Sequence, residues 1–154
     1  MEKVQKKVEQ EVNEIIPGII LMSHEPLAVG LLETARMLFG EIENIEAYSL
    51  EEGENLEEYY QHIVDAIKKF PTGVIVFIDI FGGTPCNQMM RYIQEQDKVI
   101  EVVTGMNLPM LIHAATTREK INKEFTINTA NVGREGIFRI DVESFLDDET
   151  ENNN

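Results

Sequence analysis

The sequence has one cysteine, few basic residues and no long apolar run, and each shortage excludes a class of protein. A single cysteine, Cys86, cannot form a disulfide within the chain, which favours a reducing compartment. The longest aliphatic stretch, residues 74–78, is far shorter than the roughly 20 residues of a transmembrane helix. The N-terminus also lacks the apolar core of a secretory signal. We therefore expect a cytoplasmic protein that does not insert directly into a membrane.

Lysine and arginine number only 13, against 28 aspartate and glutamate residues, for a net charge of -15. This charge repels phosphate backbones and anionic lipid surfaces, so nucleic acid is an unfavourable partner. Residues 41–58 hold eight acidic residues and residues 141–151 hold six, and neither block contains a basic residue. The first block is expected to steer basic partner proteins where it borders a site, whereas the second is interpreted as a solvated tail.

What the chain does contain is an alternation of apolar runs and helical periodicities, with 43% apolar residues among 154, enough for one domain with a core. Strands are predicted at residues 19–22, 45–50, 73–80 and 99–104. Helices are predicted at residues 26–39, 55–69, 85–96, 109–116 and 120–133. The first of these helices is expected to present an apolar face made of Leu27, Leu31, Leu32, Ala35, Leu38 and Phe39.

The two ends of the chain differ in composition from its middle. Residues 1–16, with valines at positions 4, 8 and 12, are expected to form a helical extension. Residues 17–143 are expected to form the domain, and residues 144–154 an acidic, disordered tail. Within the domain, the alternation of apolar and polar residues over 138–142 predicts a final edge strand.

Strands separated by helices predict an α/β fold, a doubly wound sheet of four parallel strands in the order 2-1-3-4, flanked by helices. Functional sites in such sheets form beyond the carboxyl ends of the strands. His24 follows the first strand, residues 79–85 follow the third, and residues 105–109 follow the fourth. These three segments are therefore the candidates for one site.

His24 and Asp79 are expected to meet, because the first and third strands are neighbours in this order. A carboxylate at the end of an apolar strand is unfavourable unless another group pairs with it. A carboxylate that accepts a hydrogen bond from one imidazole nitrogen fixes the tautomer and leaves the other nitrogen free as a nucleophile. The pair therefore predicts a reactive histidine.

The turn Gly82-Gly83-Thr84-Pro85 supplies backbone N–H groups beside a helix N-terminus, which is a typical anion site. It lacks the lysine of a nucleotide-binding P-loop. His24, His62 and His113 have no spacing typical of metal ligands, and we expect neither a metal nor another cofactor. A histidine nucleophile, an orienting aspartate and an anion cradle together predict a phosphoryl relay.

Four segments in order resemble the enzyme IIA domain of the mannose-type (mannose/fructose/sorbose) sugar phosphotransferase system. They are Ser23-His24, the stretch from Asp79 to Pro85, Gly105-Met106-Asn107-Leu108-Pro109-Met110, and Gly133-Arg134-Glu135-Gly136. The resemblance covers residues 18–142. It implies an enzyme, a bacterial phosphotransferase with a phosphohistidine intermediate.

The resemblance implies that His24 accepts phosphate from the histidine-containing phosphocarrier protein and passes it to the IIB component. The IIB component in turn serves the membrane IIC/IID permease. Asp79 would hold the imidazole. The phosphoryl oxygens would be bound by Gly82, Gly83 and Thr84, and the pocket walls would be formed by Ser23, Phe81, Gly105, Asn107 and Pro109. The resemblance further implies a homodimer in which the C-terminal antiparallel strand is exchanged.

One departure from the family pattern is Glu25, which stands where glycine usually follows the active histidine. A carboxylate there would oppose an incoming phosphate unless it points away. Other interpretations stay open: a regulatory phosphohistidine domain, a domain of the dihydroxyacetone-kinase type that shares this fold, and a thiol hydrolase built on Cys86 and His24.

Overall fold

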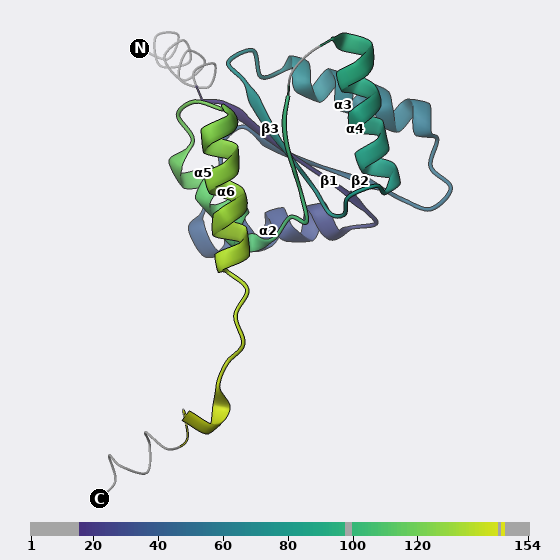
Figure 1. Cartoon of the computed structure of the whole chain (residues 1–154). Helices are drawn as coiled ribbons and strands as arrows, with labels where there is room; N and C mark the ends of the chain where they lie inside the picture. Colours follow the sequence, from purple (N-terminus) through teal and green to yellow (C-terminus); the bar gives the residue numbers. More distant parts are fainter. Residues whose placement is uncertain (1–15, 98–99, 145, 147–154) are drawn as a thin grey trace, which may run out of the picture.

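The computed structural model describes residues 16–97, 100–144 and 146, and its centre is a parallel sheet of four strands (Figure 1). The sheet has the order β2-β1-β3-β4, and each neighbouring pair runs parallel. The predicted fold class and strand order are therefore confirmed. The strands are β1 (Gly18–His24), β2 (Ile45–Leu50), β3 (Val74–Ile78) and β4 (Glu101–Thr104).

Helices cover both faces of this sheet (Figure 1). On one face lie α3 (Leu56–Lys68) and α4 (Thr84–Gln96). On the other lie α2 (Leu27–Phe39), α5 (Leu108–Thr117) and α6 (Lys123–Glu135). Residues of β1 and β3 alternate between the two resulting cores, and every residue of β3 is buried. This two-sided cover explains why β3 is a continuous apolar run rather than an alternating one.

Three helices begin at asparagines whose side chains accept hydrogen bonds from backbone N–H groups of the first turn. Asn55 accepts from Glu57 and Glu58 at the start of α3, and Asn107 and Asn122 accept in the same way at the starts of α5 and α6. Each such cap stabilises a helix by about 1 kcal/mol. Asn122 also explains why the last helix begins at Lys123 rather than at the predicted residue 120.

The predicted apolar face of α2 is too wide. Ala28, Leu32 and Ala35 are buried, whereas Leu27, Leu38 and Phe39 are more than half exposed. The buried residues have a spacing of four and three, which describes a single narrow stripe against the sheet. Periodicity shows which side of a helix is apolar, but the width of the buried stripe depends on the neighbouring elements.

The C-terminal segment leaves the body of the molecule after α6 (Figure 1). Residues 137–141, which include most of the predicted edge strand, form no strand within this single chain. Ile137, Phe138 and Ile140 are each at least two-thirds exposed. The exchange of this segment with a second subunit therefore stays a prediction, as do the three predicted domain ranges. The helical extension predicted for residues 1–16 and the tail over 144–154 lie almost entirely outside the described residues.

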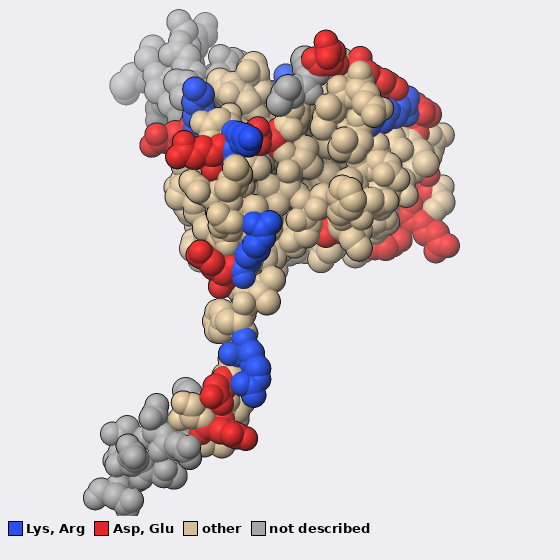
Figure 2. Space-filling view, in the orientation of Figure 1, with Lys and Arg blue, Asp and Glu red and all other residues tan. Residues whose placement is uncertain are grey.

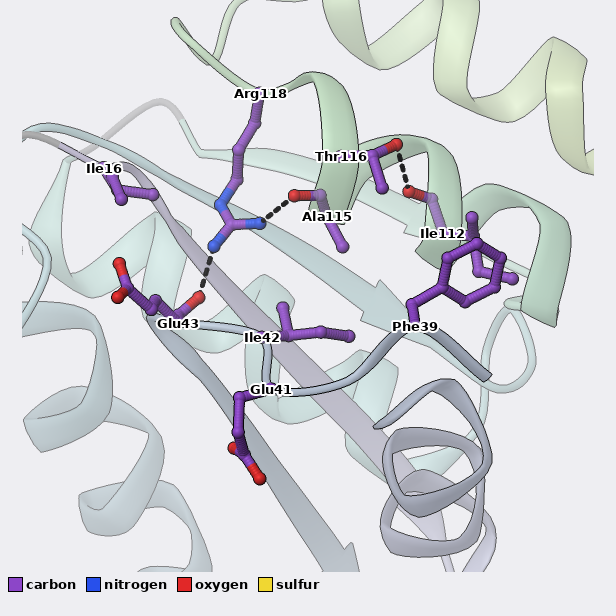
Figure 3. Close-up of a pocket in the computed structure, with 9 residues that line it drawn as sticks. All are labelled: Ile16, Phe39, Glu41, Ile42, Glu43, Ile112, Ala115, Thr116 and Arg118. Carbon is purple, nitrogen blue, oxygen red and sulfur yellow. Dashed lines mark hydrogen bonds between the residues drawn. The ribbon is translucent and has the colours of Figure 1, made fainter. Parts of the chain in front are cut away.

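At the amino ends of the strands, the buried guanidinium of Arg118 joins three segments (Figure 3). Its Nε donates to the carbonyl of Pro17 at 2.7 Å, and its two terminal nitrogens donate to the carbonyls of Ala115 and Glu43. The same side chain lines a cavity of about 290 Å³ with Ile16, Phe39, Ile42 and other residues. Arg118 thus fastens the starts of β1 and β2 to the end of α5, at the opposite end of the strands from His24.

Candidate active site at the carboxyl ends of the strands

His24 and Asp79 are in direct contact, as the strand order predicted. His24 ends β1, and Asp79 directly follows Ile78, the residue of β3 that pairs with Met22. The Asp79 backbone N–H donates to the carbonyl of Met22 at 3.1 Å, which extends the ladder by one bond. The imidazole Nδ1 then lies 2.8 Å from Oδ2 of Asp79.

Three N–H groups surround the Asp79 carboxylate. Besides the ring, the backbone N–H of His24 donates to Oδ2 and that of Ile80 donates to Oδ1, both at 2.8 Å. Burial alone would raise the pKa of Asp79, but these hydrogen bonds to His24 and Ile80 outweigh it and hold the pKa below its usual value. An ionised carboxylate only accepts, so the proton of a neutral His24 lies on Nδ1 and Nε2 carries a free lone pair.

The other side of the imidazole lies against Gly83, the N-cap residue of α4. A Cβ added to Gly83 would lie 2.6 Å from Cε1 and 3.2 Å from Nε2 of His24. Only glycine leaves room for the ring at this distance. Gly83 has no side chain that could cap α4. The positive end of this helix therefore lies beside Nε2, with backbone N–H groups that have no acceptor within the helix.

The residues predicted to bind phosphoryl oxygens form the turn that leads into α4. Gly82 has φ of +79°, a left-handed conformation that favours glycine, and Thr84 is the first residue of the helix. Phe81, before them, is 80% exposed. The turn thus brings together a helix start, a threonine and the reactive nitrogen, which is an arrangement suited to a tetrahedral anion.

Ser23, predicted as a pocket wall, makes its side-chain hydrogen bonds at the start of α2. Its side chain is completely buried. The Oγ accepts a hydrogen bond from the N–H of Ala28 at 2.8 Å and donates to the carbonyl of Glu25 at 3.1 Å. Ser23 therefore holds the connection between β1 and α2, because its hydroxyl satisfies an N–H of the first helical turn.

The segment after β4 borders the site and positions the helices that follow it. The N–H of Met106 donates to the carbonyl of Ile78, directly before Asp79. Asn107 caps α5 and donates to the carbonyl of Gly133 in α6 at 2.8 Å. Pro109 packs against Gly136, where an added Cβ would lie 2.5 Å from its Cγ. Gly105 and Asn107 line a small cavity of about 110 Å³ with residues of α6, so these predicted wall residues mainly position α5 and α6.

Two residues near the site have roles that the sequence pattern does not reveal. The hydroxyl of Tyr59 donates to the carbonyl of Tyr48 at 3.2 Å, and burial, followed by the charges of Glu54 and Asp79, raises the pKa of Tyr59. The carboxylate of Glu25 accepts a hydrogen bond from the N–H of Glu52, so this side chain points toward the loop after β2. No local motif predicts either contact.

Cys86 is 3% exposed at the start of α4, and a buried thiol is poorly placed to attack a substrate. Within residues 16–97, 100–144 and 146, no three histidine, cysteine or acidic side chains are grouped closely enough to hold a metal ion. The helices in this part of the chain are too short or too polar to cross a bilayer. The chemistry of the described site thus centres on His24.

Residues 18–130 match a family model described as "PTS system fructose IIA component", where PTS denotes the phosphotransferase system. The chain is 29% identical over 125 residues to the PTS system fructose-specific EIIA component of Bacillus subtilis, a match that covers 80% of this chain and 85% of that protein. It is 32% identical over 124 residues to the PTS system mannose-specific EIIAB component of Escherichia coli, covering 78% of this chain and 38% of that protein.

A solved structure of a IIA subunit has a similar fold. The mannose/sorbose specific IIA subunit of the phosphotransferase system from Enterococcus faecalis superimposes with a TM-score of 0.73 at 28% sequence identity. This match covers 82% of the present chain and 96% of that subunit. The matched residues of the family model include the histidine, the aspartate and the glycine turn described above.

Proposed function

Because the chain belongs to the mannose family of phosphotransferase-system IIA components, which are phosphotransferases, we propose that His24 is the residue that carries the phosphoryl group. Its donor is the histidine-containing phosphocarrier protein, and its acceptor is a IIB component during sugar uptake. The observation that supports this assignment is the contact of Nδ1 with Asp79, which leaves Nε2 as the nucleophile.

In the proposed step, the lone pair of Nε2 attacks the phosphorus of the donor phosphohistidine. The Nε2–P bond forms while the donor P–N bond breaks, and its electron pair stays with the donor ring. That ring keeps the proton on its other nitrogen and departs as neutral imidazole. His24 becomes a phosphoimidazolium that keeps its Nδ1 proton, and the Asp79 carboxylate at 2.8 Å stabilises the new positive charge.

The transferred group carries negative charge on its equatorial oxygens, which the start of α4 is suited to stabilise. Gly82, Gly83 and Thr84 are proposed to donate to these oxygens through backbone N–H groups and the threonine hydroxyl. These interactions need positioning rather than covalent chemistry, and the rigid turn against the imidazole provides it. The proposed reaction therefore needs no residue beyond the histidine, its aspartate and this turn.

The proposed function is tested by incubation of the protein with phosphoenolpyruvate, enzyme I and the phosphocarrier protein, followed by intact mass measurement. We expect the gain of one phosphoryl group that is labile in acid, as phosphohistidine is. Transfer from the labelled protein to a IIB component then distinguishes a transport component from a regulatory one. A protein that gains no phosphate in this mixture would contradict the proposal.

Gly83→Ala is expected to slow phosphorylation of His24 on the order of ten- to a hundredfold, because a Cβ 2.6 Å from Cε1 displaces the ring. The initial rate of phosphate incorporation from the phosphocarrier protein measures the effect. Gly30→Ala is the matched control, since no atom lies within 4 Å of a Cβ at that position of α2. Equal rates in the Gly83 variant and the control would show that the close contact has no role.

Partner proteins would approach an apolar rim around the histidine. Ile80 and Phe81, which directly follow Asp79, are 58% and 80% exposed. Exposed apolar groups of this size around a site are typical of a protein-binding surface. The face shown in Figure 2 is tan over much of its area, with acidic side chains at its margins and a few basic side chains on it. We propose that the rim contacts the partner while the acidic loop after β2 steers a basic protein toward it.

We also propose a homodimer that is formed through the C-terminal segment. Ile137, Phe138 and Ile140 leave the body of this chain exposed, and β4 forms an edge of the sheet. An added antiparallel strand from a second subunit would bury both. Sedimentation equilibrium at micromolar concentration is expected to find dimers, and Phe138→Asp is expected to shift them to monomers. A wild-type chain that sediments only as a monomer would exclude this arrangement.

A further inference from the structure

Glu25 occupies a backbone conformation that favours glycine, and three hydrogen bonds hold it there. Its φ is +49°, in the left-handed region. Its N–H donates to the carbonyl of Leu50 at 2.9 Å, and its own carbonyl accepts from Ser23. Its Oε1 accepts from the N–H of Glu52 at 3.1 Å. The backbone of Glu25 therefore connects the end of β1 to the last residue of β2, and its side chain reaches the segment after β2.

That segment is a tight turn of residues 51–54, called the acidic turn below because three of its four residues are glutamates. It is closed by bonds of its own: the N–H of Glu54 donates to the carbonyl of Glu51 at 3.2 Å, and Oε2 of Glu54 accepts from the N–H of Glu51 at 3.0 Å. Among the hydrogen bonds of the described residues, the only one that joins the backbone of the acidic turn to the side chain of Glu25 is donated by the N–H of Glu52. Release of that contact would free the turn without disturbing its internal bonds.

The acidic turn lies beside the histidine. His24 pairs with Leu50 in the register of β1 and β2, and the turn begins at the next residue. Acidic side chains gather at the margin of the molecule where the loop from β2 to α3 runs (Figures 1 and 2). Burial raises the pKa of Tyr59, and the charges of Glu54 and Asp79 raise it further, which indicates that the turn and the site act on the same hydroxyl.

We propose that Glu25 is a positioning residue that fastens the acidic turn beside His24, so that the carboxylates of the turn oppose a phosphoryl group on Nε2. The second part rests on the proposed function. Opposing charge raises the free energy of phosphohistidine relative to the free histidine and so favours onward transfer. Unit charges roughly 8 Å apart change such an equilibrium about three- to tenfold at an effective dielectric constant of roughly 60 to 30, between those of bulk water and the protein surface. Glu25 thus tunes this carrier toward donation.

Two variants separate positioning from the charge of Glu25 itself. Glu25→Gln keeps a side-chain oxygen that can accept from the Glu52 N–H but removes the charge. Glu25→Gly removes both the accepting oxygen and the charge. Glycine fits the left-handed backbone conformation, so this variant is expected to fold. Glu124→Gln, in the first turn of α6, is the matched control for the loss of one exposed acidic charge.

The first measurement is hydrogen exchange at the Glu52 amide in the unphosphorylated protein, which does not depend on any partner. We expect exchange in Glu25→Gly to be about tenfold faster or more, with Glu25→Gln and Glu124→Gln near the wild type. Unchanged exchange in Glu25→Gly would overturn the positioning role. A wild-type protein that accepts no phosphate would contradict the proposed function, while this measurement would still decide whether Glu25 holds the turn.

The second measurement is the equilibrium of phosphoryl exchange with the phosphocarrier protein. Glu25→Gly is expected to shift it about three- to tenfold toward phosphorylated His24, and Glu25→Gln by less. The shift is expected to shrink at 1 M KCl, because the Debye screening length there is only roughly 3 Å. A purely structural effect would not depend on salt in this way. Equal shifts in the two variants would mean that Glu25 acts through its own charge, and no shift in either would mean that the turn does not oppose the phosphoryl group. Either result overturns the proposal.

Discussion

His24→Ala is expected to abolish phosphorylation completely, because no other group in the described site combines a free nitrogen lone pair with an orienting carboxylate. The measurement is intact mass after incubation with phosphoenolpyruvate, enzyme I and the phosphocarrier protein. The loss should be larger than that from any other substitution, since the variant lacks the atom that forms the bond to phosphorus. The effect concerns the chemical step, not the binding of partners.

The control for this substitution is His62→Ala, which removes an exposed imidazole from α3 and should leave phosphate incorporation unchanged. His24 is itself half exposed at the end of β1, so its replacement should leave the sheet intact. Far-ultraviolet circular dichroism checks this expectation. Undiminished labelling of a folded His24→Ala protein would place the phosphoryl group on another residue and refute the assignment.

Asp79→Asn is expected to have the second-largest effect, a loss on the order of 10²–10⁴ in the rate of phosphoryl transfer, because an amide does not select one tautomer as a carboxylate does. Asparagine can accept from Nδ1 or donate to it, so part of the population would carry its proton on Nε2. The positive ring of the phosphorylated state would also lose its counter-charge. Rapid-quench measurement of phosphate incorporation gives the rate.

A stability effect accompanies the change in rate. The pKa of Asp79 is lowered in the folded protein, so its contribution to stability is fully present above the unfolded pKa of about 4 and is lost as the pH falls through the folded value. The free energy of unfolding of Asp79→Asn should therefore be lower than that of the wild type at pH 7, with a smaller difference at pH 3. Asp65→Asn, at an exposed position of α3, is the matched control for both measurements. A normal transfer rate in Asp79→Asn would show that tautomer control is wrongly assigned to this residue.

The fold and the central pair of the site could be predicted because their signals are local or follow from topology. The continuous apolar run of β3 indicates a strand covered on both faces, and the asparagine before α3 marks its start. Once the strand order is 2-1-3-4, His24 and Asp79 must emerge side by side, although 55 residues separate them. The prediction that these two residues share a site therefore depended on the prediction of the fold.

Other features could not be predicted because they depend on how elements pack across the chain. Examples are the width of the buried stripe on α2, the hydrogen bond from Ala28 to Ser23, and the bonds of Arg118 to Pro17 and Glu43. Their partners have no periodic relation to them along the sequence. The C-terminal alternation suggested an edge strand, but a strand needs a paired neighbour, and this single chain supplies none for residues 137–141.

The shortages in the sequence already exclude a disulfide framework within the chain and make nucleic acid an unfavourable partner, since neither conclusion depends on folding. Its motifs also identify a histidine, an aspartate and a glycine turn as one site, because parallel strands deliver their carboxyl ends to one edge. The tertiary structure decides the close contacts. The imidazole of His24 fits against Gly83 because glycine has no side chain, and the carboxylate of Glu25 turns toward Glu52. Such contacts arise from the close packing of segments distant in the chain, and no pattern along the chain encodes them separately.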